Sequence, residues 1–176
     1  MTDYFWGEDG EEEKVVLTDE HYMKMALNEA EKAFKAGVVP IGAIVVHEGE
    51  VIAKSWNQVE MLKDATAHAE ILALTQASAQ LDRWRLHGCT LYVTKEPCPM
   101  CSGALVNSRI DRVVFGMSDE KGGGCGGGFA IHDHDGLLHK VEAKAGCCEE
   151  ECRLIIQSFF KMRRQQQKEL KEKQSE

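Results

Sequence analysis

The sequence predicts an α/β fold in which a five-stranded mixed sheet lies between two layers of helices. Short β-branched runs alternate with longer stretches whose apolar residues recur at helical spacing. Two of these runs flank Glu48-Gly49, a pair typical of a tight hairpin turn. A later strand–helix–strand succession requires a parallel pair joined by a crossover helix. Antiparallel and parallel pairing in one chain therefore predict a mixed sheet.

The N-terminal part begins with an acidic lead, residues 1–15, which we expect to be disordered. Thr18 is the expected N-cap of the first helix. Asp19 and Glu20 would then lie in the first turn, where the helix dipole favours negative charge. Apolar residues recur at helical spacing after them, so one face of this helix is expected to be buried. Gly37 is expected to end it.

The remaining elements complete one predicted domain over residues 16–165. They are expected as strands at 41–46, 51–56, 90–94, 112–115 and 140–143, and as helices at 67–79, 99–107 and 149–171. Thr66 is a possible cap of the helix at 67–79. Residues 118–138 are expected to form a long loop with a run of Gly and Cys, and such loops are usually functional or mobile. Residues 166–176 are expected to form a basic and polar helical tail.

Two short motifs carry the chemistry of this sequence. His68-Ala69-Glu70 is followed along the chain by Pro97-Cys98-Pro99-Met100-Cys101. A structural zinc site is closed by four protein ligands, whereas a catalytic one leaves a position open for water. His68, Cys98 and Cys101 offer three ligands. The order H-x-E and then P-C-x-x-C is the pattern of zinc-dependent nucleobase deaminases. The sequence therefore predicts a catalytic site with one zinc ion per chain.

The spacing within each motif favours this assignment. Glu70 is not needed as a ligand and is the predicted proton carrier. Because His68 and Glu70 are two residues apart, they would point to different sides in mid-helix, so the motif is expected in a first helical turn. Cys98 and Cys101 are three apart and would share one helix face. The prolines of the second motif suit a helix start.

The cysteines also allow other readings. An isolated C-x-x-C pair can be a redox pair or half of a structural zinc site. The chain has seven cysteines, and a disulfide framework is not expected in a reducing compartment. Cys148 and Cys152 are four residues apart on an expected helix, so a second metal site is an alternative there.

Beyond the two motifs, the chain resembles the bacterial tRNA-specific adenosine deaminases, which convert adenosine to inosine at the wobble position of a tRNA anticodon. The resemblance runs from about Leu17 to Arg164. The stretches that carry it are Val39-Pro40-Ile41-Gly42-Ala43, Trp56-Asn57, Asp64 to Ile71, Leu91 to Cys101, Ser108-Arg109-Ile110, Arg112 to Gly116 and Phe159 to Arg164. It implies the cytidine-deaminase-like three-layer α/β/α fold and a homodimer with each active site near the subunit boundary.

The resemblance also implies roles for single residues. His68, Cys98 and Cys101 match the family's zinc ligands, and Glu70 matches its proton shuttle. Asn57 stands where the family's asparagine contacts the target base.

Three more residues belong to the predicted substrate site. Asp119 resembles an aspartate that contacts the nucleotide backbone beside the base, and Phe160 is a candidate pocket wall that adjoins a basic run with Arg163. The chain departs from the family at Lys95, where an apolar residue is usual, at Asn107, where histidine is frequent, and in its glycine-rich loop.

The charge and hydropathy of the chain limit the partners and the cellular location that we expect. The net charge of −8 is unusual for an RNA-binding protein, but the basic residues gather near the C-terminus. No run of about eighteen apolar residues is present, so no membrane span is expected. The acidic N-terminus does not resemble a secretory signal. We expect a cytoplasmic protein.

Three functions follow as hypotheses. The first is zinc-dependent deamination of the wobble adenosine of tRNA, with the anticodon stem-loop as partner. The alternative is deamination of a free base or nucleoside such as guanine or cytosine, which the acidic net charge favours. The third, a zinc-stabilised binding module without catalysis, is disfavoured by Glu70, because a structural site has no need of a spare acid.

Overall fold

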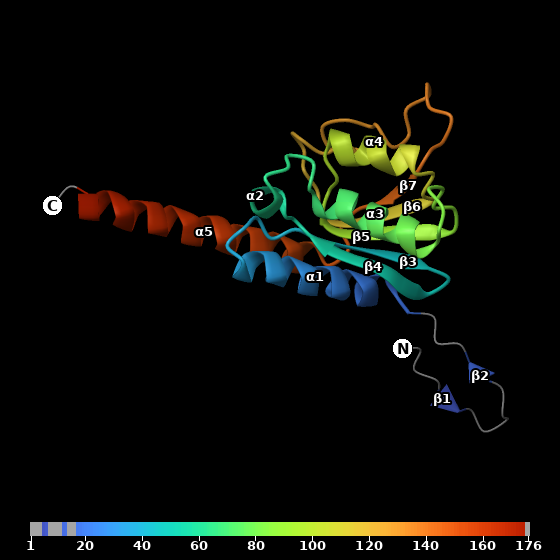
Figure 1. The fold of residues 1–176 in the computed structure, drawn as a ribbon, viewed down its shortest axis with the longest axis horizontal. Helices are drawn as coiled ribbons and strands as arrows, with labels where there is room; N and C mark the ends of the chain where they lie inside the picture. The colour runs from blue at the N-terminus through green and yellow to red at the C-terminus, as the bar shows by residue number, and fades with distance from the viewer. Residues whose placement is uncertain (1–4, 7–11, 14–16, 175–176) are drawn as a thin grey trace.

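A computed structural model describes residues 5–6, 12–13 and 17–174 of the chain. The elements follow in the order β1 (Phe5–Trp6), β2 (Glu12–Glu13), α1 (Asp19–Lys35), β3 (Gly42–His47), β4 (Glu50–Trp56), α2 (Val59–Leu62), α3 (Ala69–Gln80), β5 (Cys89–Lys95), α4 (Pro99–Asn107), β6 (Arg112–Met117), β7 (Glu142–Lys144) and α5 (Glu149–Gln174). Figure 1 shows the central sheet between helices, with α5 extending away from it.

The sheet has the strand order β4-β3-β5-β6-β7. β3 pairs antiparallel with both β4 and β5, and the β5–β6 and β6–β7 pairs are parallel. The predicted five-stranded mixed sheet is confirmed. So is the hairpin, in which Glu48 and Gly49 both take positive φ as a type I′ turn requires.

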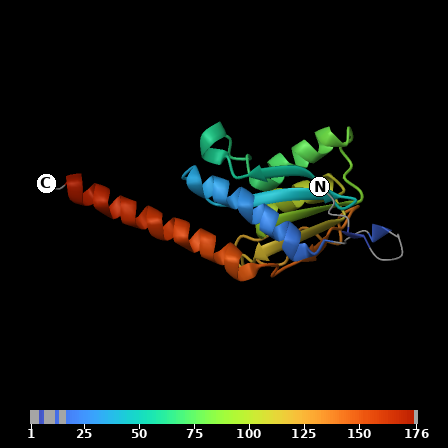
Figure 2. The same ribbon diagram turned by 90° about the horizontal axis from the view of Figure 1, so that it is seen from below.

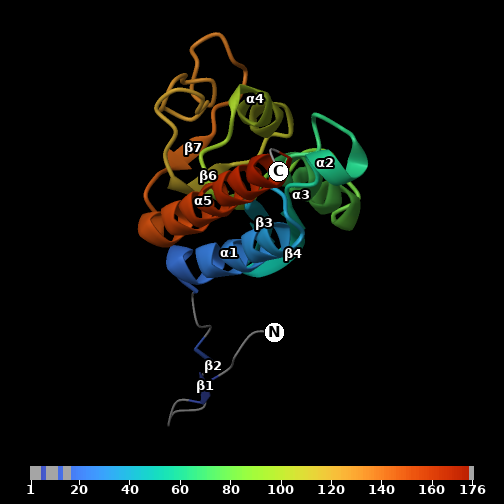
Figure 3. The ribbon, with the colours of Figure 1, turned by 90° about the vertical axis from the view of Figure 1, so that its left-hand side faces the viewer.

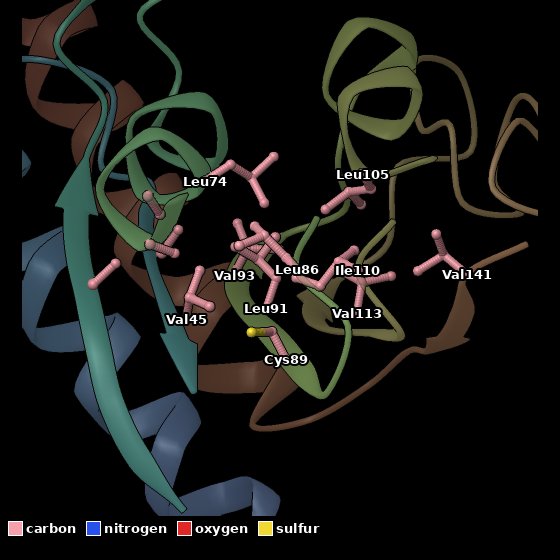
Figure 4. Packing of buried hydrophobic residues seen from close by; sticks show 14 of the residues in the cluster. Val45, Leu74, Leu86, Cys89, Leu91, Val93, Leu105, Ile110, Val113 and Val141 are labelled. Carbon is pink, nitrogen blue, oxygen red and sulfur yellow. The ribbon is translucent and has the colours of Figure 1, made fainter. Parts of the chain in front are cut away.

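Helices cover both faces of the sheet, as predicted. α1 and α5 pack on one face and α3 on the other, beside α4, an arrangement seen in Figures 2 and 3. Alternate residues of each strand therefore enter opposite cores. On β3, Ala43 and Val45 pack toward α3, and Ile44 and Val46 pack toward α1. The larger core, on the α3 side, is drawn in Figure 4.

The start of α1 is tied to the sheet through one carboxylate. Thr18 is the N-cap, and its side chain accepts a bond from the backbone N–H of His21, as predicted. Asp19 accepts two bonds of 2.9 Å from the guanidinium of Arg112, one of 2.6 Å from Lys144 and one of 2.9 Å from the Tyr92 hydroxyl. These partners stand on the neighbouring strands β5, β6 and β7, so Asp19 fixes α1 to that half of the sheet.

The structure differs from several sequence predictions. Thr66 is not the cap of α3, because its hydroxyl donates to the carboxylate of Asp64 and the N-cap is His68. The last strand lies at 142–144 and not at 140–143. The short helix α2 was not expected. The long loop at 118–138 is confirmed, with one isolated bridge between Cys125 and Ala130.

At the C-terminal side of the domain, α5 extends away from the sheet. α5 runs to Gln174, so the tail predicted at 166–176 is helical where the structure describes it. The predicted acidic lead, 1–15, lies largely outside the described residues, although β1 pairs antiparallel with β2. Among the described residues, no helix is both long enough and apolar enough to cross a bilayer.

The Asp19 contacts predict a pH-dependent stability. Its hydrogen bonds with Arg112 hold the pKa of this carboxyl well below its ordinary value of about 3.9. A depressed folded-state pKa contributes stability above the unfolded-state pKa, and this is lost as pH falls through the folded-state value. We expect Asp19→Asn to lower the free energy of unfolding by about 2 kcal/mol at pH 7 and by less below pH ~4.

Urea unfolding of both proteins at pH 7 and at pH ~3 measures this difference. Glu142→Gln is the matched control. Glu142 also pairs with Arg112, but its side chain is 72% exposed, so its removal should change stability little. A constant Asp19→Asn deficit at both pH values would contradict the prediction.

Candidate metal centre and substrate pocket

Two of the predicted zinc ligands are the N-cap residues of neighbouring helices. His68 precedes α3 with φ −71° and ψ 152°, and Cys98 precedes α4 with φ −69° and ψ 172°. Pro99 occupies the first turn of α4, where its missing N–H costs nothing. Neither side chain makes a capping hydrogen bond, so both remain available as ligands. Cys101 enters from the first turn of α4 and is fully buried.

The three side chains converge. His68 Nδ1 lies 3.7 Å from Cys98 Sγ and 3.5 Å from Cys101 Sγ. Tetrahedral zinc with its usual bond lengths places nitrogen and sulfur ligands about 3.6 Å apart. The donor set therefore fits zinc in both geometry and chemistry. Of the residues that the structure describes, these three form the only cluster of at least three His, Cys, Asp or Glu side chains close enough to hold a metal.

The ligands are electrostatically coupled. A hydrogen bond with Cys101 lowers the pKa of the Cys98 thiol to about 3, and burial opposes the shift. The same bond raises the pKa of Cys101 far above its ordinary value. Cys98 is thus the thiolate of the pair, and its proximity raises the pKa of His68. A metal dication bound here would release the Cys101 proton, since thiolates and not thiols are ligands.

Glu70 lies in the first turn of α3, two residues after the histidine ligand, as the spacing predicts. It is buried, with 4% of its surface exposed. Burial raises the pKa of its carboxyl above the ordinary value. Such a group exchanges protons more readily near neutral pH than an exposed glutamate does.

A cavity of about 250 Å³ opens beside the metal ligands. Its lining residues are Val39, Ile41, Asn57, Val59, Glu60, His68, Ala69 and Glu70. The Asn57 amide donates to the Val39 carbonyl at 3.3 Å and accepts from the Val59 N–H at 3.4 Å, so it joins the two walls. The volume is below the roughly 300–1,000 Å³ of sites for drug-sized ligands. It suits one flat ring.

A second, more open cavity of about 540 Å³ adjoins the first. Both are lined by Val39 and Glu60. α5 contributes Phe159, Phe160, Arg163, Arg164 and Gln167 to its wall. Phe160 is 43% exposed, so its ring is available to solvent there. The structure thus places Phe160 and Arg163 next to the cavity that His68 and Glu70 line.

Comparison with known proteins agrees with this geometry. Residues 17–164 match the profile of the MafB19-like deaminase family. The tRNA-specific adenosine deaminase of Bacillus subtilis (strain 168) is 46% identical over 158 residues, which cover 90% of this chain and 98% of that protein. The corresponding enzyme of Aquifex aeolicus (strain VF5) is 50% identical over 82% of this chain and 95% of its own.

The chain belongs to the tRNA-specific adenosine deaminase family.

Solved structures of deaminases share the fold. One, from a study of A-to-I editing by tRNA:A34 deaminases at the wobble position of transfer RNA, has a TM-score of 0.74 and 41% identity, covering 77% of this chain and 98% of its own. A guanine deaminase from Nitrosomonas europaea has a TM-score of 0.69 and 25% identity, covering 82% of this chain and 86% of its own. The expected cytidine-deaminase-like fold is confirmed.

Not every residue singled out from the sequence lies at this deaminase site. Asp119 is not among the residues that line either cavity, and its carboxylate forms an ion pair with Lys95. Among the described residues, no group of three or more metal-ligating side chains includes Cys148 or Cys152, so the alternative metal site there gains no support.

The sequence analysis also missed some residues. Val59 and Glu60 line the deaminase cavity from α2, a helix without a side-chain cap or an apolar repeat. Glu96 is another such residue, a buried carboxylate with three backbone partners. Its position directly before the zinc motif was the available signal.

The metal assignment predicts a matched set of variants. His68→Ala and Cys98→Ser each remove one of three ligands and should lower zinc content from about one ion per chain to well below it. Metal analysis of the purified proteins measures this. Cys148→Ser removes a part-exposed thiol outside the cluster and should retain the zinc. Full zinc retention in both ligand variants would exclude the site.

Proposed function

We propose that this protein is a zinc-dependent hydrolase that converts adenosine to inosine at the wobble position of tRNA. The observation that carries the proposal is the convergence of His68, Cys98 and Cys101 beside a cavity lined by Glu70 and Asn57. The similarity to tRNA-specific adenosine deaminases over most of the chain supports the substrate.

The reaction consumes one water and releases ammonia from C6 of the base. His68, Cys98 and Cys101 would hold the zinc, which as a Lewis acid makes water a nucleophile near neutral pH. Glu70 takes one proton from the attacking water and gives it to the ring nitrogen, and it then takes the proton of the added hydroxyl and gives it to the leaving amine. Its burial suits this transfer, because burial raises the pKa of its carboxyl above the ordinary value.

The cavity explains how a single base would be held. Val39, Ile41 and Val59 supply apolar walls for a flat ring, and the Asn57 amide stands between them. Each amide atom of Asn57 makes one backbone bond and retains capacity for another. We therefore assign it to the polar edge of the base. The adenosine must leave the stack of the anticodon loop to enter.

The adjoining cavity suits the nucleotides beside the target. Phe160 offers an exposed ring for stacking, and Arg163 and Arg164 offer charges for phosphates. The net charge of the chain is negative, which is unusual for an RNA-binding protein. Phosphate contacts depend on nearby charges, however, and the charges beside this cavity include two arginines.

A second candidate is deamination of a free base such as guanine. The likeness to the guanine deaminase of Nitrosomonas europaea favours it, at 25% identity. The tRNA-specific relatives are more similar, at 46% and 50% identity. Ammonia release from a transcribed anticodon stem-loop, compared with release from guanine, cytosine and adenine, separates the two.

We further propose that the protein acts in the cytoplasm as a homodimer. The family resemblance supports the dimer, and a tRNA substrate places the activity with cellular tRNA. Light scattering during gel filtration measures the mass in solution. A monomeric mass at micromolar concentration would exclude a stable dimer.

The role of Glu70 predicts a separation of zinc binding from turnover. Glu70→Ala should keep the metal but lower kcat by about 10²-fold or more, because the proton carrier is removed. Single-turnover deamination of the stem-loop by zinc-loaded protein measures this. Glu50→Ala, an exposed residue of the β3–β4 hairpin, is the control and should be near wild type. If zinc-loaded Glu70→Ala turned over at the wild-type rate, Glu70 could not be the proton carrier.

The role of α5 predicts a change in salt dependence. Arg163→Ala should weaken stem-loop binding and reduce the slope of log affinity against log salt concentration by about one unit, since one phosphate contact is lost. Lys173→Ala carries the same charge change near the end of α5 and should leave the slope nearly unaltered. Equal slopes for wild type and Arg163→Ala would remove this arginine from the interface.

A further inference from the structure

The backbone on both sides of Cys98 is held by hydrogen bonds. The carbonyl of Pro97, directly before it, accepts the backbone N–H of Gly124 at 2.7 Å and the hydroxyl of Ser102 at 3.3 Å. The carbonyl of Cys98 itself accepts the backbone N–H of Ser102 at 2.8 Å. Rotation of either peptide group would break these bonds, so they fix the direction in which the Cys98 side chain leaves the backbone.

One buried carboxylate orders the loop that supplies the Gly124 donor. This glycine-rich loop follows β6 and lies beside α4 in Figures 1 and 3. Glu96 is 3% exposed, and its Oε1 accepts the backbone N–H groups of Cys125 at 3.0 Å and Gly127 at 2.9 Å. Its Oε2 accepts the N–H of Asp119 at 2.8 Å. These donors lie on both sides of Gly124 in the chain, so Glu96 sets the position of the Gly124 N–H.

The loop packs so closely that two of its positions require glycine. A Cβ atom at Gly123 would lie 2.2 Å from the carboxyl carbon of Glu96. A Cβ atom at Gly124 would lie 2.4 Å from the Ser102 hydroxyl and 3.1 Å from the carbonyl carbon of Cys98. The first glycine therefore admits the carboxylate, and the second admits the backbone of the predicted zinc ligand.

A second route links the loop to the same carbonyl. The Ser102 hydroxyl lies 3.2 Å from Cys125 Sγ. A hydroxyl has one proton, and that of Ser102 is directed at the Pro97 carbonyl, so the Cys125 thiol is the donor to the hydroxyl oxygen. Because Glu96 accepts the N–H of Cys125, the carboxylate reaches the peptide before Cys98 through both Cys125 and the loop backbone.

We propose that Glu96 is a positioning residue for the metal ligand Cys98 and acts on it through the glycine-rich loop. The carboxylate holds the loop, the loop holds the peptide before Cys98, and the thiolate is thereby directed at the metal position before a metal binds. A ligand that is already ordered loses less entropy on binding. The proposal rests on the zinc site of the proposed function and is independent of its substrate.

Glu96→Gln gives the first test. Glutamine has one carbonyl oxygen, so its NH₂ group must face at least one of the three N–H donors and break that bond. We expect zinc to leave the loaded protein about tenfold faster in an excess of a chromophoric chelator, the lower end of the effect of residues that orient metal ligands. The amides of Gly124 and Cys125 should exchange with solvent faster than in wild type.

The control removes the same charge from the same loop. Glu120 is exposed, so Glu120→Gln should change neither the zinc dissociation rate nor the amide exchange of the loop.

Gly124→Ala gives the second test and leaves Glu96 intact. The added Cβ would meet Ser102 and the Cys98 backbone, so zinc should again dissociate about tenfold faster. Gly103→Ala is the matched control on α4, because a Cβ there meets nothing within 4 Å, and it should release zinc at the wild-type rate. This pair also decides the question if Glu96→Gln does not fold.

Cobalt(II) bound in place of zinc supplies a readout of ligand geometry, since its visible absorption depends on the arrangement of its ligands. We expect altered spectra for Glu96→Gln and Gly124→Ala and wild-type spectra for both controls. Wild-type spectra and wild-type zinc dissociation in both test variants, with only a lower melting temperature, would overturn the proposal, because Glu96 would then be a structural loop anchor alone. Failure of the zinc site itself is distinguishable, because the wild-type protein would then hold no zinc.

Discussion

The site depends on one geometric constraint, the meeting of two helix N-termini at one end of the sheet. His68 and Cys98 are both cap residues in extended conformation, and their side chains make no capping hydrogen bond. Cap positions normally use the side chain to satisfy backbone donors. Here the two side chains lie 3.7 Å apart instead, and Glu70 and Cys101 follow in the first turns of α3 and α4. The packing of α3 and α4 therefore fixes the distances between the ligands.

The sequence was sufficient wherever the determining interactions are local or repeated. The two motifs predicted that His68, Cys98 and Cys101 converge, because i,i+3 spacing and flanking prolines define the helix of the cysteines. The β3–β4 hairpin followed from its Glu48-Gly49 turn. The succession of strands and helices predicted a sheet covered on both faces, and Ile44 and Val45 accordingly enter opposite cores. The family resemblance and the basic run near the C-terminus added Asn57, Phe160 and Arg163 as candidate substrate-binding residues. Their positions along the chain alone do not indicate that they lie near one another.

Interactions between segments that are distant in the chain could not be predicted from the sequence. Glu96 reaches backbone donors 23, 29 and 31 residues away, and a backbone N–H leaves no trace in the sequence. α2 is a single turn without a side-chain cap, and it is too short to show a helical repeat of apolar residues, so the sequence did not predict it. Thr66 looked like a helix cap, but Asp64 competes for its hydroxyl in a local turn.

Because α5 is long, some of its basic residues lie near the cavity and others lie too far away to act on it electrostatically. At 1.5 Å per residue, Lys173 stands about 15 Å further along the helix than Arg163. This exceeds the Debye length of about 8 Å at physiological ionic strength. The charges of the distal lysines are therefore largely screened from the cavity at physiological ionic strength. Evolution can therefore lengthen, shorten or recharge the outer turns without altering the chemistry, and such changes alter only how fast a polyanion is captured.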